Sequence, residues 1–345
     1  MWVRKHFSLR NILSFSGIHI LWITGWCTLV TCLHVIFHDF WPEIPWLPIS
    51  IIGTAVAFYV GFKNNQSYDR MWEARKIWGA IVNSSRAWGS AVDTFISNQF
   101  TDTHIAENDL HQIKRKIIYR HIGWLYSLRS QLLIPTPWEH IRQGSKMKKS
   151  TEARMKRFGI GLFDDKDTRD NLKCYLPPEE RDRLINYSNT ATQIINQQAR
   201  DLKDLRKKDI IDDFRHMELQ NLLKEFYVHQ GKAERIKKFP LPRQYANSSL
   251  IFVVIFILLL PLGMVTEFHK MGGIGPWVSI PFSIIVSWVF IMMELIGDYS
   301  ENPFEGLGND IPMLSLCRVI EIDLMEILEE ENIPKPIEAV NGVLM

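Results

Sequence analysis

Three long stretches of this chain contain no charged residue. Residues 11–38, 44–62 and 244–266 hold no Asp, Glu, Lys or Arg, although such residues make up 23% of the sequence. A helix needs about 20 mostly apolar residues to cross the ~30 Å hydrocarbon core of a bilayer. Together with the apolar run before Glu294, these stretches predict four membrane-spanning helices, at about Ile18–Phe37, Ile44–Phe62, Ser248–Val265 and Pro276–Ile296. They argue against an ordinary soluble enzyme.

Basic residues mark one side of the predicted spans. Residues 63–245 carry 34 of the 40 Lys and Arg but 23 of the 38 Asp and Glu, while the short connections within each pair of spans carry few charges. The positive-inside rule therefore places both termini and residues 63–245 in the cytoplasm. The chain then divides into an N-terminal part with two spans, a cytoplasmic region, a second pair of spans and an acidic cytoplasmic tail, at 1–62, 63–245, 246–296 and 297–345.

The cytoplasmic region and the tail are expected to be helical. Apolar residues recur at helical intervals, and no alternating strand pattern is found, so the fold class is all-α. The second span is expected to continue without a break into residues 63–98. A basic segment at 139–173 is poor in large apolar residues and reads as a solvated insertion, with a lipid-headgroup contact as the alternative. The remaining helices are expected at 107–133, 179–206, 210–237 and 313–331.

Catalytic signatures are not found in the sequence. It contains no P-loop, HExxH, GxSxG or paired CxxC motif, so we expect no enzyme, no catalytic residue and no metal-dependent chemistry. The four cysteines are read as buried or reduced thiols. His19, His34 and His38, in or beside the first span, could relay protons, but helix packing is the stronger interpretation because that span has no acidic partner.

The second span carries two stripes at four-residue spacing. Gly53, Ala57 and Gly61 form a stripe of small residues that permits close helix packing. Thr54, Phe58 and the adjoining Phe62 form a stripe of larger side chains. One interpretation is a packed bundle whose aromatic residues face lipid or a neighbouring helix. The other is a ring of such helices around an axis, where Thr and Phe form a narrow, uncharged constriction that gates by dewetting.

Distinctive motifs follow the second span and the fourth. Residues 61–75 read GFKNNQSYDRMWEAR, and Glu301-Asn302-Pro303-Phe304 is followed by Asn309-Asp310. Pro240-Leu241-Pro242 precedes the third span, and the tail contains Ile320-Glu321-Ile322-Asp323-Leu324. Together these motifs resemble those of the bestrophin family, in its bacterial branch. The resemblance extends over nearly the whole chain, in order and around the four spans.

This resemblance implies a homopentameric ion channel of the bacterial inner membrane, with one pore on the fivefold axis. The family's neck residues fall on Thr54, Phe58 and Phe62. Thr54 departs from the larger aliphatic residue common at this position, so the top of the neck should be looser and the two phenylalanines should form the main barrier. A second constriction, at the cytoplasmic aperture, is expected near Leu223 and Phe226.

Eukaryotic relatives bind Ca²⁺ through an acidic run after the Asn-Pro-Phe motif. This chain offers Glu301, Glu305 and Asp310, separated by a glycine-containing turn. Ca²⁺ needs six to eight oxygen ligands, usually with several carboxylates. We therefore expect no Ca²⁺ site here and no cofactor, and we assign Asp310 a structural role in a turn or helix cap.

The expected function is passive conduction of small monovalent ions across the lipid bilayer by an assembly of identical chains. Phenylalanine edges are partially positive and the faces partially negative, so the tilt of the neck rings affects which ion is favoured. Because bacterial family members include cation channels, we expect Na⁺ and K⁺ to be favoured over chloride. A chloride channel of the same architecture is one alternative, and a non-conducting membrane scaffold or signalling protein is another. No nucleic-acid partner is expected.

Overall fold

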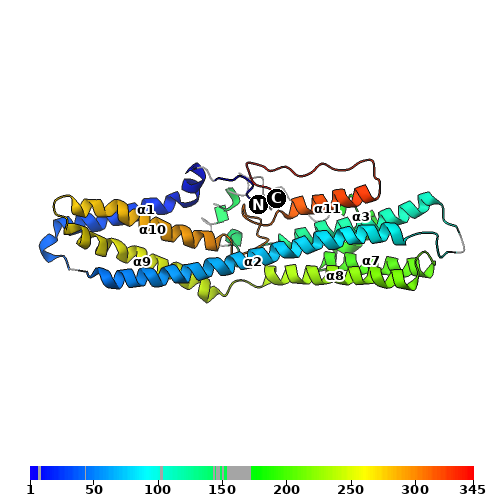
Figure 1. Cartoon of the computed structure of the whole chain (residues 1–345), viewed down its shortest axis with the longest axis horizontal. Coiled ribbons are helices and arrows are strands. Elements are labelled where there is room, and N and C mark those ends of the chain that lie inside the picture. The colour runs from blue at the N-terminus through cyan, green and yellow to red at the C-terminus, as the bar shows by residue number, and fades with distance from the viewer. Residues whose placement is uncertain are drawn as a thin grey trace. The chain divides into compact units, whose positions relative to one another are not determined.

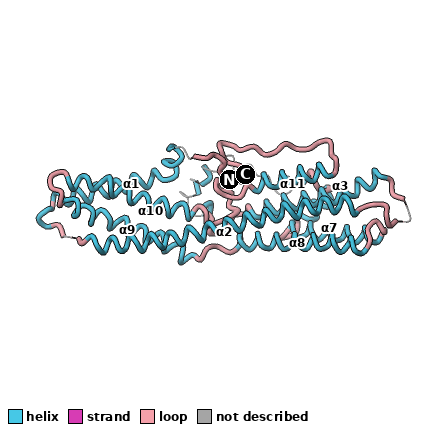
Figure 2. The backbone as a smooth tube through the Cα atoms, viewed as in Figure 1, coloured by secondary structure: helices cyan, strands magenta, loops and turns pink. Residues whose placement is uncertain are grey.

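The computed structural model contains two compact units, and most of the chain is described in it. Unit 2 comprises residues 4–70 and 240–302, and unit 1 comprises residues 1–3, 71–239 and 303–345. The described residues form helices and loops, and none of them belongs to an extended strand (Figure 2). Most of the basic segment 139–173 lies outside the described residues. The structure describes all residues except 7–8, 43, 102–103, 143, 145–147, 150 and 154–171.

Among the described residues, four helices are long and apolar enough to cross a membrane, and unit 2 contains three of them and the first part of the fourth. Within this unit α1, α9 and α10 pack against one another (Figure 1). The predicted second span and the helix after it form one uninterrupted helix, α2, whose residues up to Arg70 belong to unit 2. The elements are α1 (Leu9–Ile36), the 3-10 helix η1 (His38–Phe40), α2 (Trp46–Phe95), α9 (Arg243–His269) and α10 (Gly275–Asp298).

Buried aliphatic and aromatic residues hold unit 2 together. Val56 and Val60 of α2 lie four residues apart and share the buried side of the helix with Gly53. Phe256 of α9 belongs to the same cluster. A small residue on α9 makes room for a side chain of α2, since a Cβ added at Gly263 would lie 2.6 Å from Cδ1 of Ile49.

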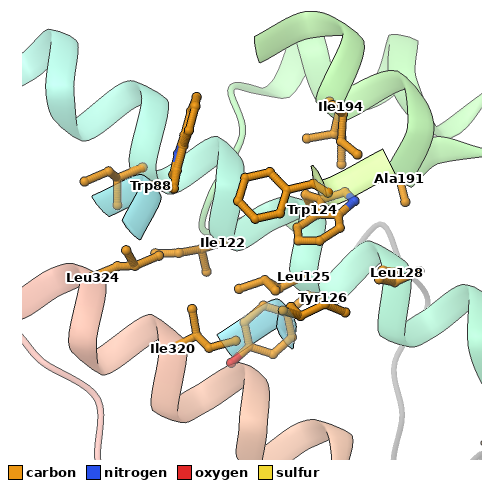
Figure 3. Packing of buried hydrophobic residues seen from close by; sticks show 14 of the residues in the cluster. Trp88, Ile122, Trp124, Leu125, Tyr126, Leu128, Ala191, Ile194, Ile320 and Leu324 are labelled. Carbon is orange, nitrogen blue, oxygen red and sulfur yellow. The ribbon is translucent and has the colours of Figure 1, made fainter. Parts of the chain in front are cut away.

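Unit 1 packs the remaining helices around a core rich in tryptophan. Trp88, Trp124 and Leu324, from three different helices, are each 0% exposed, and Figure 3 shows them around a shared interior with residues of α7. Full burial of such side chains supplies most of the stabilisation of a helical unit. Besides the rest of α2, the elements are α3 (Glu107–Leu132), η2 (His140–Arg142), α6 (Pro178–Ile185), α7 (Thr190–Lys207), α8 (Asp213–Lys238) and α11 (Met313–Ile327).

The helix expected at 179–206 is in fact two helices, α6 and α7. The chain leaves the first helix at Asn186 and begins the second after Asn189, whose side chain accepts a hydrogen bond from the backbone N–H of Thr192 at 2.9 Å. Asparagine is a favoured N-cap because its short amide satisfies a free N–H of the first turn. This local cap overrides the continuous helical pattern of the sequence.

The two ends of the chain pair with each other inside unit 1. Trp2 forms an antiparallel bridge with Val343, and the backbone N–H of Val3 donates to the carbonyl of Gly342 at 3.0 Å. The N–H of Leu344 donates to the carbonyl of Met1 at 2.8 Å. The N-terminal residues thus belong to unit 1, although the α1 helix that follows belongs to unit 2.

Candidate functional site

The neck residues expected from the sequence lie together on one exposed side of α2. Thr54, Phe58 and Phe62 are four residues apart, so their side chains share one face of the helix. All three are exposed, with 68% of Phe58 and 62% of Phe62 accessible. The buried residues of α2 occupy another side, toward α9. An exposed apolar face on a membrane-length helix has to be covered by lipid or by another protein chain.

The hydroxyl of Thr54 is turned back onto its own helix. Its Oγ1 donates to the carbonyl oxygen of Ser50 at 3.0 Å. A threonine hydroxyl has a single hydrogen, so this bond leaves only oxygen lone pairs and the methyl group to interact outside the helix. Thr54 is therefore an acceptor on the exposed face of α2.

The small-residue stripe of α2 is used for packing at one end only. A Cβ added at Gly53 would lie 2.7 Å from Cε2 of Phe256, so the glycine makes room for this ring on α9. Gly61, at the other end of the stripe, has no atom within 4 Å of such a Cβ. The packing interpretation of the stripe therefore holds at Gly53, while Gly61 lies beside open space.

A buried ion pair follows the stripe directly. Lys63, the residue after Phe62, points into unit 2 and binds the carboxylate of Glu294 on α10, with 2% and 4% of the two side chains accessible. Ser249 of α9 donates its hydroxyl to the other carboxylate oxygen at 2.5 Å. Three helices thus meet at one buried polar cluster. Sequence reasoning missed this cluster, although Glu294 is the one acidic residue of the predicted fourth span.

The first acidic residue of the motif considered for Ca²⁺, Glu301, is bound by two arginines in unit 2. Arg243 donates from Nη1 to Oε1 of Glu301 at 2.7 Å, and Arg70 donates to its backbone carbonyl at 2.9 Å. Burial raises the pKa of Glu301, Asp298 adds to this rise, and Lys63 and Arg243 oppose it. The arginine contacts are those expected of a structural anchor.

The other two acidic residues considered for Ca²⁺ are engaged in unit 1. Glu305 accepts from the backbone N–H of His140 at 2.5 Å and lies 2.9 Å from its Nδ1. Burial raises the pKa of Asp310, and its bonds to backbone N–H groups oppose that rise. These bonds match the structural role expected of Asp310, while the absence of a Ca²⁺ site stays a prediction. The donors to Asp310 are the N–H groups of Phe304, Gly306 and Ile311.

The structure places Leu223 and Phe226, the residues expected at a cytoplasmic aperture, in the interior of unit 1. Both belong to α8, and they are 1% and 0% exposed in the core of unit 1. The ring of Phe226 lies 4.4 Å from that of His121 and 5.0 Å from that of Trp124, measured between centroids. A side chain enclosed by its own chain cannot line an aperture. The apolar spacing on α8 was correct, but it marks the packed face of the helix.

Four membrane-length helices in the described part of the chain, and an uncharged exposed face on the second of them, define an all-helical membrane protein. The model of the bacterial and fungal bestrophin proteins matches residues 2–326. The chain therefore belongs to the bestrophin family, as the motifs predicted, and this membership supports an ion channel and not an enzyme.

Curated relatives and solved structures agree with this assignment. The voltage-dependent anion channel-forming protein YneE of Escherichia coli K12 is 26% identical over 290 residues, which cover 84% of this chain and 79% of that protein. A voltage-dependent anion channel-forming protein of Ralstonia nicotianae is 24% identical over 96% of both chains. The crystal structure of a bacterial bestrophin homologue from Klebsiella pneumoniae superposes with a TM-score of 0.73 at 21% identity, covering 91% of this chain and 99% of that one.

Proposed function

We propose that this chain forms a homopentameric channel that conducts small monovalent ions passively through a neck of five α2 helices. The observation that carries the proposal is the uncharged, exposed stripe of Thr54, Phe58 and Phe62 on a membrane-length helix of a bestrophin-family chain. Placed around a fivefold axis, each of these residues becomes a ring. Membership of the bestrophin family supports the pentamer, because resemblance to this family implies a homopentameric channel.

The chemistry of the stripe suits a hydrophobic constriction. Phenylalanine rings offer no full replacement for the hydration shell of an ion, so the neck would control passage by wetting and dewetting. Lys63 adds no free charge at the end of the stripe, because it is buried and paired with Glu294. Selectivity in such a neck would come from the quadrupoles of the rings and from charges outside the neck.

We propose that the conducted ions are anions. This part of the proposal is supported by the relatives from Escherichia coli and Ralstonia nicotianae, whose names describe anion channel-forming proteins. The sequence-based preference for Na⁺ and K⁺ finds no support in these names. One structural observation nevertheless favours cations as the second candidate, because Thr54 can present only acceptor lone pairs to the neck.

We further propose that the channel lies in the bacterial inner membrane with both termini in the cytoplasm. The excess of basic residues in 63–245 supports this orientation. The pairing of Trp2 with Val343 agrees with it, because an even number of spans returns the chain to the side on which it began. In this arrangement unit 1 would be cytoplasmic.

The decisive experiment measures mass and conductance on the same purified protein. We expect a pentamer in detergent, and currents in planar bilayers whose single-channel conductance rises in Phe58→Ala/Phe62→Ala because the narrowest rings are removed. The matched control is Phe282→Ala/Ile285→Ala, which removes side chains that are 50% and 58% exposed on α10. Reversal potentials under a salt gradient give the sign of the permeant ion.

Each outcome has a definite consequence. Equal conductance in the wild type and in Phe58→Ala/Phe62→Ala would exclude these residues from the pore. A monomer or dimer without ion flux from loaded liposomes would favour the non-conducting scaffold. A reversal potential near the equilibrium potential of K⁺ would mean that the channel conducts cations and not anions. The proposal for the neck residues would not be affected.

A further inference from the structure

One charged residue lies on the face of α2 that carries the proposed neck. Asp69 comes eleven residues after Phe58 and seven after Phe62, and it is exposed. At about 100° per residue, its direction differs by about 20° from that of each phenylalanine, and it lies about 10 Å beyond Phe62 along the helix. These residues all belong to the part of α2 in unit 2. Asp69 therefore continues the exposed stripe of the neck residues.

The other charged residues in this part of α2 are turned toward the protein. The helix residues of unit 2, all of which the structure describes, carry three charges, on Lys63, Asp69 and Arg70. Lys63 is buried and paired with Glu294. Arg70 is half-buried and donates from Nε to the backbone carbonyl of Glu301 at 2.9 Å. Asp69 is thus the one exposed charged residue of α2 within unit 2.

The carboxylate of Asp69 has no counter-ion in the described part of the chain. No ion pair or side-chain hydrogen bond joins it to another described residue. An exposed aspartate carries a full negative charge at neutral pH. If five α2 helices surround an axis, as proposed for the neck, five such charges form a ring next to the ring of Phe62. Nothing on this face of α2 within unit 2 neutralises them.

We infer that Asp69 is a selectivity-determining residue, whose five copies form a ring of carboxylates that attracts cations and repels anions beside the neck. The inference rests on the proposed function, because it requires the α2 helices to surround the pore. Rings of Asp or Glu side chains select cations in ion channels by raising the local concentration of cations. In an assembly that conducts anions, the same ring acts against the permeant ion and limits its current.

The size of the effect follows from Coulomb's law and from screening by salt. Five unit charges about 10 Å from an ion in water, at about 0.1 M salt, change the local concentration of a monovalent ion by about 3-fold. Cations gain and anions lose by this factor, so the cation-to-anion ratio changes by about 10-fold. At 1 M salt the Debye length is only about 3 Å, and the effect should nearly disappear.

The test measures reversal potentials of the full-length protein in planar bilayers under a gradient of NaCl. In Asp69→Asn the ratio of chloride to sodium permeability should rise by about 10-fold near 0.1 M salt, whichever ion the wild type prefers, and by little at 1 M salt. Asp69→Glu retains the charge and should keep the wild-type ratio. The matched control is Asp182→Asn, which removes an exposed carboxylate of α6 in unit 1 and should also keep it.

The inference can fail separately from the proposed neck. It is overturned if Asp69→Asn keeps the wild-type permeability ratio while Phe58→Ala/Phe62→Ala still raises the conductance. It is also overturned if the shift persists at 1 M salt, as a change of pore shape would, or if Asp182→Asn shifts the ratio equally. A wild type without current would refute the proposed function, and this inference would fall with it. Elution of each variant with the mass of the wild-type assembly establishes that it is folded.

Discussion

Removing one member of the buried pair formed by Lys63 and Glu294 should destabilise unit 2 by several kcal/mol. Only 2% and 4% of the two side chains are accessible, so the member left behind is a buried charge without its counter-ion. Breaking such a pair costs about 3–5 kcal/mol. We therefore expect the free energy of unfolding to fall by about 3–5 kcal/mol in Lys63→Met and in Glu294→Gln.

The loss follows from the contacts that each single variant leaves behind. In Glu294→Gln the buried ammonium of Lys63 no longer faces a carboxylate. In Lys63→Met the buried carboxylate of Glu294 keeps the hydroxyl of Ser249 but loses its ammonium partner.

The assay is denaturant unfolding in detergent at pH 7, followed by tryptophan fluorescence. Lys63→Met/Glu294→Met should recover most of the lost stability, because replacing both charges by apolar groups leaves no unpaired charge. The control Glu73→Gln breaks an accessible pair with Lys76 and should cost less than about 1 kcal/mol. A loss of less than about 1 kcal/mol in either single variant, or a double variant as unstable as the sum of both, would refute the reasoning.

Three further predictions test the packing of each unit. Gly53→Ala should lower the free energy of unfolding by about 1–3 kcal/mol, because its Cβ would lie 2.7 Å from Phe256. Gly61→Ala should stabilise α2 by about 0.5–1 kcal/mol, because a Cβ there meets no atom within 4 Å. Thermal melts of the two variants check both expectations. Leu223→Ala should cost about 2–5 kcal/mol in denaturant unfolding and leave single-channel conductance unchanged, since the side chain is 1% exposed. Burial lowers the pKa of His121 to about 3, so as the pH falls the unfolded state binds a proton before the folded state does. The free energy of unfolding should therefore fall by about 1.4 kcal/mol for each pH unit below about 6.5. Unfolding titrations of His121→Gln between pH 5 and 7 should lack this pH dependence.

The architecture could be predicted because the bilayer imposes a length and a composition on each span. The uncharged run ending at Phe62 predicts a spanning helix, and the apolar spacing beyond Lys63 predicts its continuation; both are found in α2. The same spacing predicts that Thr54, Phe58 and Phe62 share a face. A break between helices that depends on one N-cap residue, such as Asn189, gives a much weaker signal in the sequence than a membrane span does.

The contacts of a helix face could not be predicted in the same way. Periodicity shows that Leu223 and Phe226 lie on one side of α8, but a pore-lining face and a packed face have the same apolar spacing. The partner of Lys63 is likewise hidden, because Glu294 is 231 residues further along the chain. In both cases the three-dimensional arrangement of other helices decides the role of the residue.

The pairing of residues 1–3 with residues 342–344 has a consequence for biosynthesis. Val3 cannot form its hydrogen bond with Gly342 until that residue has been synthesised, roughly 20–70 s later at a ribosomal rate of about 5–20 residues per second. During that interval the spans of α1 and α2 can already enter the bilayer, while residues 1–3 are still without residues 342–344 to pair with. Unit 1 is therefore completed only after translation has passed residue 344, so assembly of several chains through this unit follows synthesis of each one.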